Sequence, residues 1–277
     1  MVEKEHYTFG DTDLAAARLR LLARVFEPSS ARLLARVGPA NSAIAIDLGC
    51  GPGHTTWLLA QHSDARRVIG LDQSPRLLAT AAEQYGDDRL SFAECDVTTP
   101  PFPAPPAALL YARFLLTHLR DPGRAIRAWA SVALCGGRLV LEETATMVLQ
   151  HPAFARYYGL VERMQVHYGQ RMYVGRDLGA LAQAAAPEWL VEDARILQTE
   201  LPAADMARLH LLNLQTWSDD AFARAHYDRA ELADLAACLE RVASGAISAS
   251  PVALGMGQVV LRRSGDDPGG AARPWGR

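Results

Sequence analysis

Short apolar runs alternate with amphipathic helical patterns through the first half of the chain. The runs 44–48, 68–72, 90–96, 107–112 and 138–141 each have the length of one buried strand. The segments between them carry apolar residues at the spacing of one helix face. This alternation is typical of a parallel sheet with helices on both faces. We therefore predict an α/β fold with a Rossmann-like sheet.

Two proline-containing pairs mark helix starts. Ser74-Pro75 and Asp121-Pro122 each place a capping side chain before a proline at the first helical position. Near the N-terminus, apolar residues share one helix face over 14–26, and a second short helix is expected over 32–37, before Gly38-Pro39.

The second half of the chain is mostly helical in pattern. Its long apolar and aromatic segments have helical spacing, with a break near Ser218. The stretch after Ser264 is rich in glycine and proline, so we expect it to be disordered. We predict helices over 151–170, 178–186 and 203–242, and strands within 189–201 and over 252–263.

Composition removes several enzyme classes. Lys4 is the only lysine among 28 basic residues, and it lies in a polar N-terminal stretch. Pyridoxal enzymes, P-loop NTPases and protein kinases need a lysine in the site, so these classes are excluded. The net charge of −3, without a long basic run, argues against a nucleic-acid partner.

The chain shows neither a signal peptide pattern nor an apolar run of 18 residues. Its four cysteines lack CxxC spacing, so we expect no metal site and a reducing, cytoplasmic environment. We also expect no membrane association, and a monomer or homodimer.

The most informative motif joins the first strand to the next helix. Gly49, Gly51 and Gly53 follow Asp47, and Asp72 ends the second strand. Glycines let the backbone approach a ligand closely, and an acid at the end of strand two can accept two ribose hydroxyls. A ligand-free glycine turn is the alternative, but it does not account for Asp72.

Two cofactors compete for this geometry. A dinucleotide site has G-x-G-x-x-G, whereas the spacing here is G-x-G-x-G after Asp47. That carboxylate would repel a pyrophosphate but suits the ammonium group of S-adenosylmethionine. The charge argument therefore favours S-adenosylmethionine over NAD.

Five segments in this order and spacing resemble the class I S-adenosylmethionine-dependent methyltransferases. Among these, the sequence is most similar to bacterial small-molecule enzymes of the trans-aconitate and ubiquinone methyltransferase type. The resemblance covers roughly residues 7–263. Its motifs are IDLGCGPGHTTWLLA, VIGLDQSP, FAECDVTTPPFP, YARFLLTHLRDP and LCGGRLVLEE.

The resemblance implies a mostly parallel sheet of seven strands with an antiparallel C-terminal strand, helices on both faces and an α-helical cap. It divides the chain into a helical lid, a cofactor-binding core, a cap that holds the substrate, the last core strands and a tail. These parts are 1–40, 41–150, 151–188 with 203–248, 189–202 with 249–263, and 264–277, respectively.

The resemblance also implies the residues that bind the cofactor. Asp47 would orient the ammonium group, Asp72 would hold the ribose, and Asp96 would accept from the adenine amino group. Tyr7 would belong to a lid, and Arg18 would meet the carboxylate. The remaining residues expected at the cofactor are Gly49, Cys50, Gly51, Gly53, Gln73, Leu77, Val97, Ala112 and Arg113.

Three side chains near the strand ends are candidates for catalysis. His118 follows strand four and has the pKa range of a general base. Glu142 ends strand five and is a second candidate, with Arg113 as a third. Structural roles compete with each assignment: His118 as a helix partner, and Arg113 and Glu142 as an ion pair.

The aromatic helices of the second half are expected to cover the cofactor and bind the substrate. Apolar walls with a few polar groups suit a small apolar or aromatic metabolite. Ordinary core packing is the alternative for any one of these residues. The expected substrate residues are Tyr157, Tyr158, Met164, His167, Tyr168, Asn213 and Trp217.

The sequence thus predicts methyl transfer to a small metabolite, in secondary metabolism, with S-adenosylhomocysteine as the second product. The accepting atom, whether O, N or C, stays open. The main alternative is a cyclase or rearrangement enzyme that keeps the fold and the cofactor without transferring the methyl group. A non-catalytic binding module is less consistent with the complete set of cofactor residues.

Overall fold

The computed structural model describes residues 12–37 and 44–265 of the chain. Within these ranges, seven strands form one sheet in the order β3-β2-β1-β4-β5-β7-β6. Strands β1 to β5 pair in parallel, and β7 runs antiparallel to both β5 and β6. The sheet predicted from the sequence is confirmed. The strands are β1 (Ile44–Leu48), β2 (Arg67–Asp72), β3 (Leu90–Glu94), β4 (Ala107–Arg113), β5 (Ala133–Val148), β6 (Trp189–Leu201) and β7 (Val252–Arg263).

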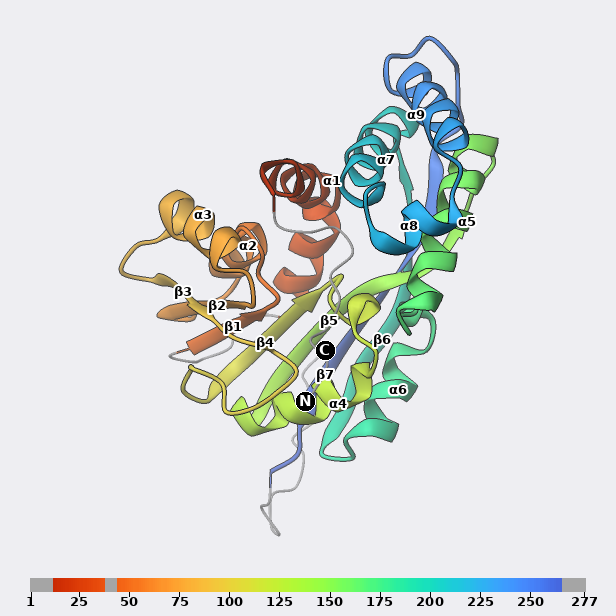
Figure 1. Cartoon of the computed structure of the whole chain (residues 1–277). Helices are drawn as coiled ribbons and strands as arrows, with labels where there is room; N and C mark the ends of the chain where they lie inside the picture. Colours follow the sequence, from red (N-terminus) through yellow and green to blue (C-terminus); the bar gives the residue numbers. More distant parts are fainter. Residues whose placement is uncertain (1–11, 38–43, 266–277) are drawn as a thin grey trace.

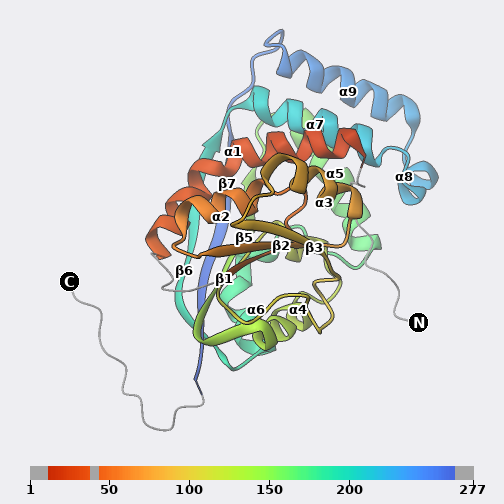
Figure 2. The same ribbon diagram turned by 90° about the vertical axis from the view of Figure 1, so that its left-hand side faces the viewer.

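Helices cover both faces of this sheet. Figure 2 shows α1, α2 and α3 above the sheet and α4 and α6 below it. The helices are α1 (Asp13–Val37), α2 (His54–His62), α3 (Pro75–Tyr85), α4 (Pro122–Trp129), α5 (Pro152–His167), α6 (Leu178–Ala185), α7 (Ala203–Trp217), α8 (Ala221–His226) and α9 (Arg229–Ala243), with short 3₁₀ turns η1 (Leu116–His118), η2 (Ala130–Val132) and η3 (Val174–Asp177).

Both predicted helix starts are confirmed by capping hydrogen bonds. The Ser74 hydroxyl accepts from the Leu77 amide at 3.2 Å, at the start of α3. The Asp121 carboxylate accepts from the Arg124 amide at 2.8 Å, at the start of α4. Each bond satisfies an amide that has no partner within its helix.

The N-terminal segment corrects one prediction. Instead of two helices over 14–26 and 32–37, the structure has the single helix α1, with Pro28 in its interior. Phe26 on one side of this proline and Leu33 on the other are both buried. Packing on both sides of Pro28 thus keeps the two halves in one helix, although proline lacks an amide hydrogen for the helical bond.

Strand β5 is longer than the predicted run 138–141. It pairs with β7 from Arg138 opposite Arg262 to Val148 opposite Ala253. The long antiparallel partner therefore extends β5 well beyond the point where its pairing with β4 ends, at Arg113 opposite Glu142.

The far ends of β5, β6 and β7 support a group of helices that we call the cap, comprising α5, α7, α8 and α9 (Figure 1). Leu254 and Met256 of β7 are buried in the same apolar cluster as Trp217 and Leu239 of the cap. By contrast, α6 packs against α4 and β6. The segment 151–188, which was expected to lie wholly in the cap, therefore has α5 in the cap and α6 against the sheet. No helix in the described ranges is long and apolar enough to cross a membrane.

Candidate active site

The loop after β1 is held in a tight turn by the glycines. Gly49, Gly51 and Gly53 have φ values of 70°, 52° and 84°, in the left-handed region that favours glycine. The amides of Gly49 and Cys50 both donate to the carbonyl of Leu71, at 2.8 and 3.0 Å. The turn is therefore fastened to the end of β2.

Two of these glycines have different surroundings. A Cβ on Gly53 would lie 3.0 Å from both Ala81 and Tyr85, so this residue allows α3 to pack closely. A Cβ on Gly51 would meet only Leu19 within 4 Å, at 3.6 Å. Gly51 faces open space, and its missing side chain leaves that space free for a ligand.

Asp72 joins the turn to the end of β2. One carboxylate oxygen accepts from the Gly51 amide at 2.8 Å, and the other accepts from the Ser74 amide at 2.9 Å. The side chain is only half-buried and lines the space beside the turn. Asp96, on the next loop, is exposed and accepts from the amide and hydroxyl of Thr98 at 2.8 and 2.7 Å.

An open cleft runs along this turn and the carboxyl ends of the parallel strands. We call it the cleft. Asp47, Gly53 and Ala112 do not line it, and Tyr7 lies outside the described residues. The cleft brings together most of the residues predicted to bind the cofactor: Arg18, Gly49, Cys50, Gly51, Asp72, Gln73, Leu77, Asp96, Val97 and Arg113.

Asp47 lies beneath the turn rather than in the cleft. It is 1% exposed, and one of its oxygens accepts from the hydroxyls of Thr55 and Thr56, both at 2.7 Å. Burial raises the pKa of Asp47 to about 6. These contacts fasten the first turn of α2 to β1, and contact between Asp47 and a ligand ammonium group stays a prediction.

Known proteins have sequences similar to the part of the chain that contains the glycine turn. Residues 46–141 match the family model described as a methyltransferase domain. Over 114 residues the chain is 40% identical to a trans-aconitate 2-methyltransferase of Methylobacterium radiotolerans, which covers 41% of this chain and 42% of that protein. The match therefore spans less than half the length of this relative.

Residues 46–141 are thus similar to a methyltransferase domain. The resemblance found in the sequence is confirmed, and so is the cofactor class, S-adenosylmethionine.

Solved structures of low identity share the fold. A geranyl diphosphate methyltransferase in complex with S-adenosylmethionine has a TM-score of 0.53 and 16% identity, covering 95% of this chain and 100% of that chain. A 4+2 cyclase has a TM-score of 0.51 and 19% identity, covering 94% and 85%. Both show that the fold of this chain occurs in known proteins.

The candidate base His118 lies where the cleft meets a second space. It ends η1 and lines both spaces. Burial, with a contribution from the positive charge of Arg18, lowers the pKa of His118 to about 3. The imidazole is therefore neutral at physiological pH but a weak base, so the catalytic role of His118 stays a prediction to which this pKa adds no support.

The other two catalytic candidates occupy different places. Arg113 lines the cleft and donates to the Ser30 hydroxyl at 3.0 Å. Glu142 is fully buried and lines neither space; it accepts from the hydroxyl of Tyr111 at 2.6 Å and from Gln258 at 2.7 Å. Its catalytic role stays a prediction, to which these contacts add no support.

The neighbouring Glu143 supports the site in a way that the predicted set missed. Its Oε1 accepts from the Leu116 amide at 2.6 Å, within the turn that carries His118. Burial raises the pKa of Glu143 to about 8, so the carboxyl group is mostly protonated at neutral pH. Adjacent strand residues point to opposite faces, which is why Glu143 reaches the Leu116 amide while Glu142 contacts Tyr111 and Gln258.

The second space, which we call the chamber, lies between α1, the strand ends and the cap. It shares Arg18, Leu22, Phe114 and His118 with the cleft, so the two spaces adjoin. Three predicted substrate residues line it: Tyr157, Tyr158 and Asn213.

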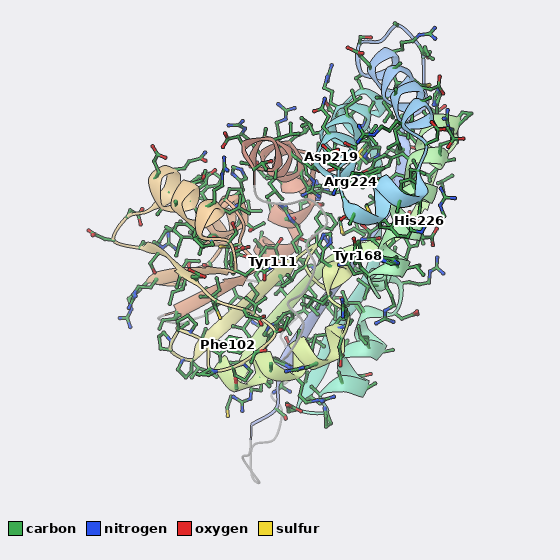
Figure 3. The ribbon with its side chains drawn as sticks, viewed as in Figure 1. Phe102, Tyr111, Tyr168, Asp219, Arg224 and His226 are labelled. Atoms are coloured by element: carbon green, nitrogen blue, oxygen red, sulfur yellow. The ribbon has the colours of Figure 1, made fainter. Side chains whose placement is uncertain are left out.

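The other predicted substrate residues lie elsewhere. Met164 and Trp217 are fully buried in the apolar cluster of the cap. Tyr168 donates to Asp220 at 2.9 Å, beside α8 (Figure 3). His167 is exposed and stacks on Phe222. Gln165 and His210 also line the chamber but were not among the predicted residues. One sequence signal could have indicated His210, because it lies on one helix face at i, i+3, i+4, i+7 spacing with Met206, Leu209 and Asn213.

Proposed function

We propose that this protein transfers a methyl group from S-adenosylmethionine to a small, largely apolar or aromatic metabolite. The observation that carries the proposal is the junction of the two spaces. A cleft with the residues of a cofactor site opens beside a chamber with apolar walls, and Arg18 and His118 line both. Such an arrangement can hold a donor and an acceptor next to each other.

The residues of the cleft fit the proposed cofactor. The space in front of Gly51 would be filled by any side chain at that position. Asp72 presents a half-buried carboxylate that can accept from ribose hydroxyls, and Asp96 offers another acceptor for an amino group. When bound, S-adenosylmethionine supplies an electrophilic methyl group on a sulfonium sulfur.

The protein's own contribution is to position the acceptor and exclude water. The walls provided by Phe114, Met147 and Leu209 exclude water from around the acceptor. His118 lines both spaces and stays the candidate for the proton that the reaction releases, although burial lowers its pKa to about 3 and so makes it a weak base. Glu143 holds the turn that places His118.

The similar proteins suggest trans-aconitate as a second candidate acceptor. The observation in its favour is the 40% identity to an enzyme named for that substrate, over 41% of this chain. The charge and the polar groups of the chamber lining bear on the choice between the two acceptor classes.

The test uses S-adenosylmethionine with a deuterated methyl group, incubated with the protein and a metabolite extract. We expect a product that is heavier by one labelled methyl group, together with S-adenosylhomocysteine. A product of unchanged mass that forms only with the cofactor would instead indicate the cyclase or rearrangement alternative. Absence of any cofactor-dependent product across extracts rich in apolar metabolites would contradict the proposal.

A further inference from the structure

The chamber contains a buried histidine with an unusual environment. His210, on α7, is 1% exposed, and its ring stacks on that of Tyr157, with centroids 4.1 Å apart and planes 10° apart. Phe154 and Tyr158 meet the ring at near-perpendicular angles of 81° and 88°. Three aromatic rings therefore fix the orientation of the imidazole.

Neither ring nitrogen of His210 has a hydrogen-bond partner among the described residues. Gln165, on the facing helix α5, is 4% exposed, and its side-chain oxygen also has no partner there. Buried polar atoms without partners are rare in folded proteins because they lose their hydration without compensation. Both side chains line the chamber, so a ligand in it can supply the missing bonds.

The two helices present these groups on regular faces. Tyr158, Val161 and Gln165 follow one face of α5 at spacings of three and four residues, and all three line the chamber. His210 and Asn213 lie on the facing side of α7. The polar atoms are thus held on rigid helices, not on loops.

Charge limits the kind of ligand. Arg18 is the only charged side chain among the described residues that line the chamber, and its Nε donates to Asn213. Burial, with a contribution from Arg18, lowers the pKa of His210 to about 3, so its ring is neutral. Several carboxylates placed in such a space would lack cationic partners, at a high desolvation cost.

We propose that the chamber selects an alcohol or phenol with an apolar body and at most one negative charge. A hydroxyl group donates and accepts, which matches the acceptor oxygen of Gln165 and the N–H of the neutral His210. In this assignment His210 and Gln165 determine specificity, and a tricarboxylate such as trans-aconitate is a poor ligand. The proposal rests on the proposed function, since it names the acceptor class of the same site.

The test measures binding rather than turnover. Equilibrium dialysis with protein saturated with S-adenosylhomocysteine compares 2-naphthol with naphthalene, which has the same body without the hydroxyl group. We expect the wild-type protein to bind 2-naphthol about tenfold tighter, the scale of one or two net hydrogen bonds. Trans-aconitate should bind more weakly than either.

Two variants test which residues cause the preference for 2-naphthol. His210→Phe keeps an aromatic ring on Tyr157 but removes both nitrogens, and Gln165→Leu removes the acceptor oxygen. Each should reduce the preference for 2-naphthol to less than about threefold. His226→Phe, at an exposed histidine of α8, is the matched control and should keep the full preference.

The outcomes separate this proposal from the proposed function. If S-adenosylhomocysteine binds but the wild-type protein shows no preference for 2-naphthol, or prefers trans-aconitate, the acceptor class is wrong while the methyltransferase function stands. A preference that persists in both variants overturns the roles of His210 and Gln165. If S-adenosylhomocysteine does not bind, the proposed function fails, and dialysis without it tests the chamber alone.

Discussion

The cleft and the chamber adjoin, but they are built by different means. The turn that shapes the cleft uses backbone geometry and a few short contacts, such as the Gly51 amide on Asp72. The chamber is made mainly of side chains from α1, α5, α7 and the ends of β5 and β7, with others from the segment after β4. Side chains on a packed helix can be replaced without changing the path of the backbone. The glycines of the turn cannot be replaced in this way, because the backbone conformation depends on them.

This difference suggests a division of roles. The turn that shapes the cleft tolerates little change because all three glycines have left-handed φ values and two of them, Gly49 and Gly53, are also closely packed. The chamber can change its polar groups while the cap keeps its apolar cluster. Cofactor binding is therefore expected to depend on backbone geometry, and acceptor choice on a few side chains such as His210.

The largest expected effect is on the glycine turn. Gly53→Ala should destabilise the protein by about 2–5 kcal/mol, because a left-handed alanine is strained and its Cβ would press on Ala81 and Tyr85. Gly136→Ala is the matched control: its φ is 75°, and nothing lies within 4 Å of its Cβ, so only the backbone cost of about 1–2 kcal/mol applies. Urea unfolding measures both, and equal losses would contradict the packing role of Gly53.

The next prediction concerns the affinity of the cleft. Asp72→Ala should weaken binding of S-adenosylhomocysteine by about 10- to 100-fold, the scale of lost charge-assisted hydrogen bonds. Asp87→Ala removes a carboxylate that accepts from the amides of Arg89 and Leu90 in a turn away from the cleft. That control should leave the affinity for S-adenosylhomocysteine unchanged. Equal affinities of the wild-type protein and both variants in calorimetry would refute the role of Asp72.

A third prediction tests the burial of the chamber through pH. The pKa of His210 is about 3 in the folded protein and near 6.5 when unfolded, so below pH 6.5 the unfolded state binds a proton that the folded state does not. Between pH 7 and 5, His210 alone should therefore lower the stability by about 2 kcal/mol, while the raised pKa values of Asp47 and Glu143 act in the opposite direction. His210→Phe should remove this contribution from the profile, measured by urea unfolding; an unchanged slope would mean that the ring is solvated.

The smallest expected effect is on the outer surface of the cap. Arg156 of α5 and Asp234 of α9 form an ion pair of 2.8 Å, with side chains 47% and 71% exposed. A double-mutant cycle with alanine should give a coupling energy below about 1 kcal/mol, because solvent screens the charges. A larger coupling would show that surface charge, and not apolar packing, holds the cap together.

The comparison also separates what the sequence predicts from what it does not. All seven strands, both capped helix starts and the glycine turn with Asp72 follow from local patterns: apolar runs, Ser-Pro and Asp-Pro pairs, and glycines before an acid. These signals are short in sequence and act through the backbone. The other predicted cleft residues came from the resemblance to a known family. The single helix α1 was missed because the packing on both sides of Pro28 is not a local property.

The chamber was predicted less well for the same reason. Tyr157, Tyr158 and Asn213 line it, but the helical spacing that suggested them equally suggested Met164 and Trp217, which are core residues. Which side of an aromatic helix meets a cavity depends on the rotation of that helix against its neighbours. His210 and Gln165 could be found only once α5 and α7 were placed face to face.

Calorimetric titration of the purified protein with S-adenosylhomocysteine and, separately, with NAD tests the central claim most directly. The cleft has a carboxylate, Asp72, bound to the glycine turn, and Asp47 lies buried beneath that turn. The structure therefore predicts saturable binding of S-adenosylhomocysteine at one site per chain and no measurable binding of NAD. Saturable binding of NAD, without binding of S-adenosylhomocysteine, would contradict this account.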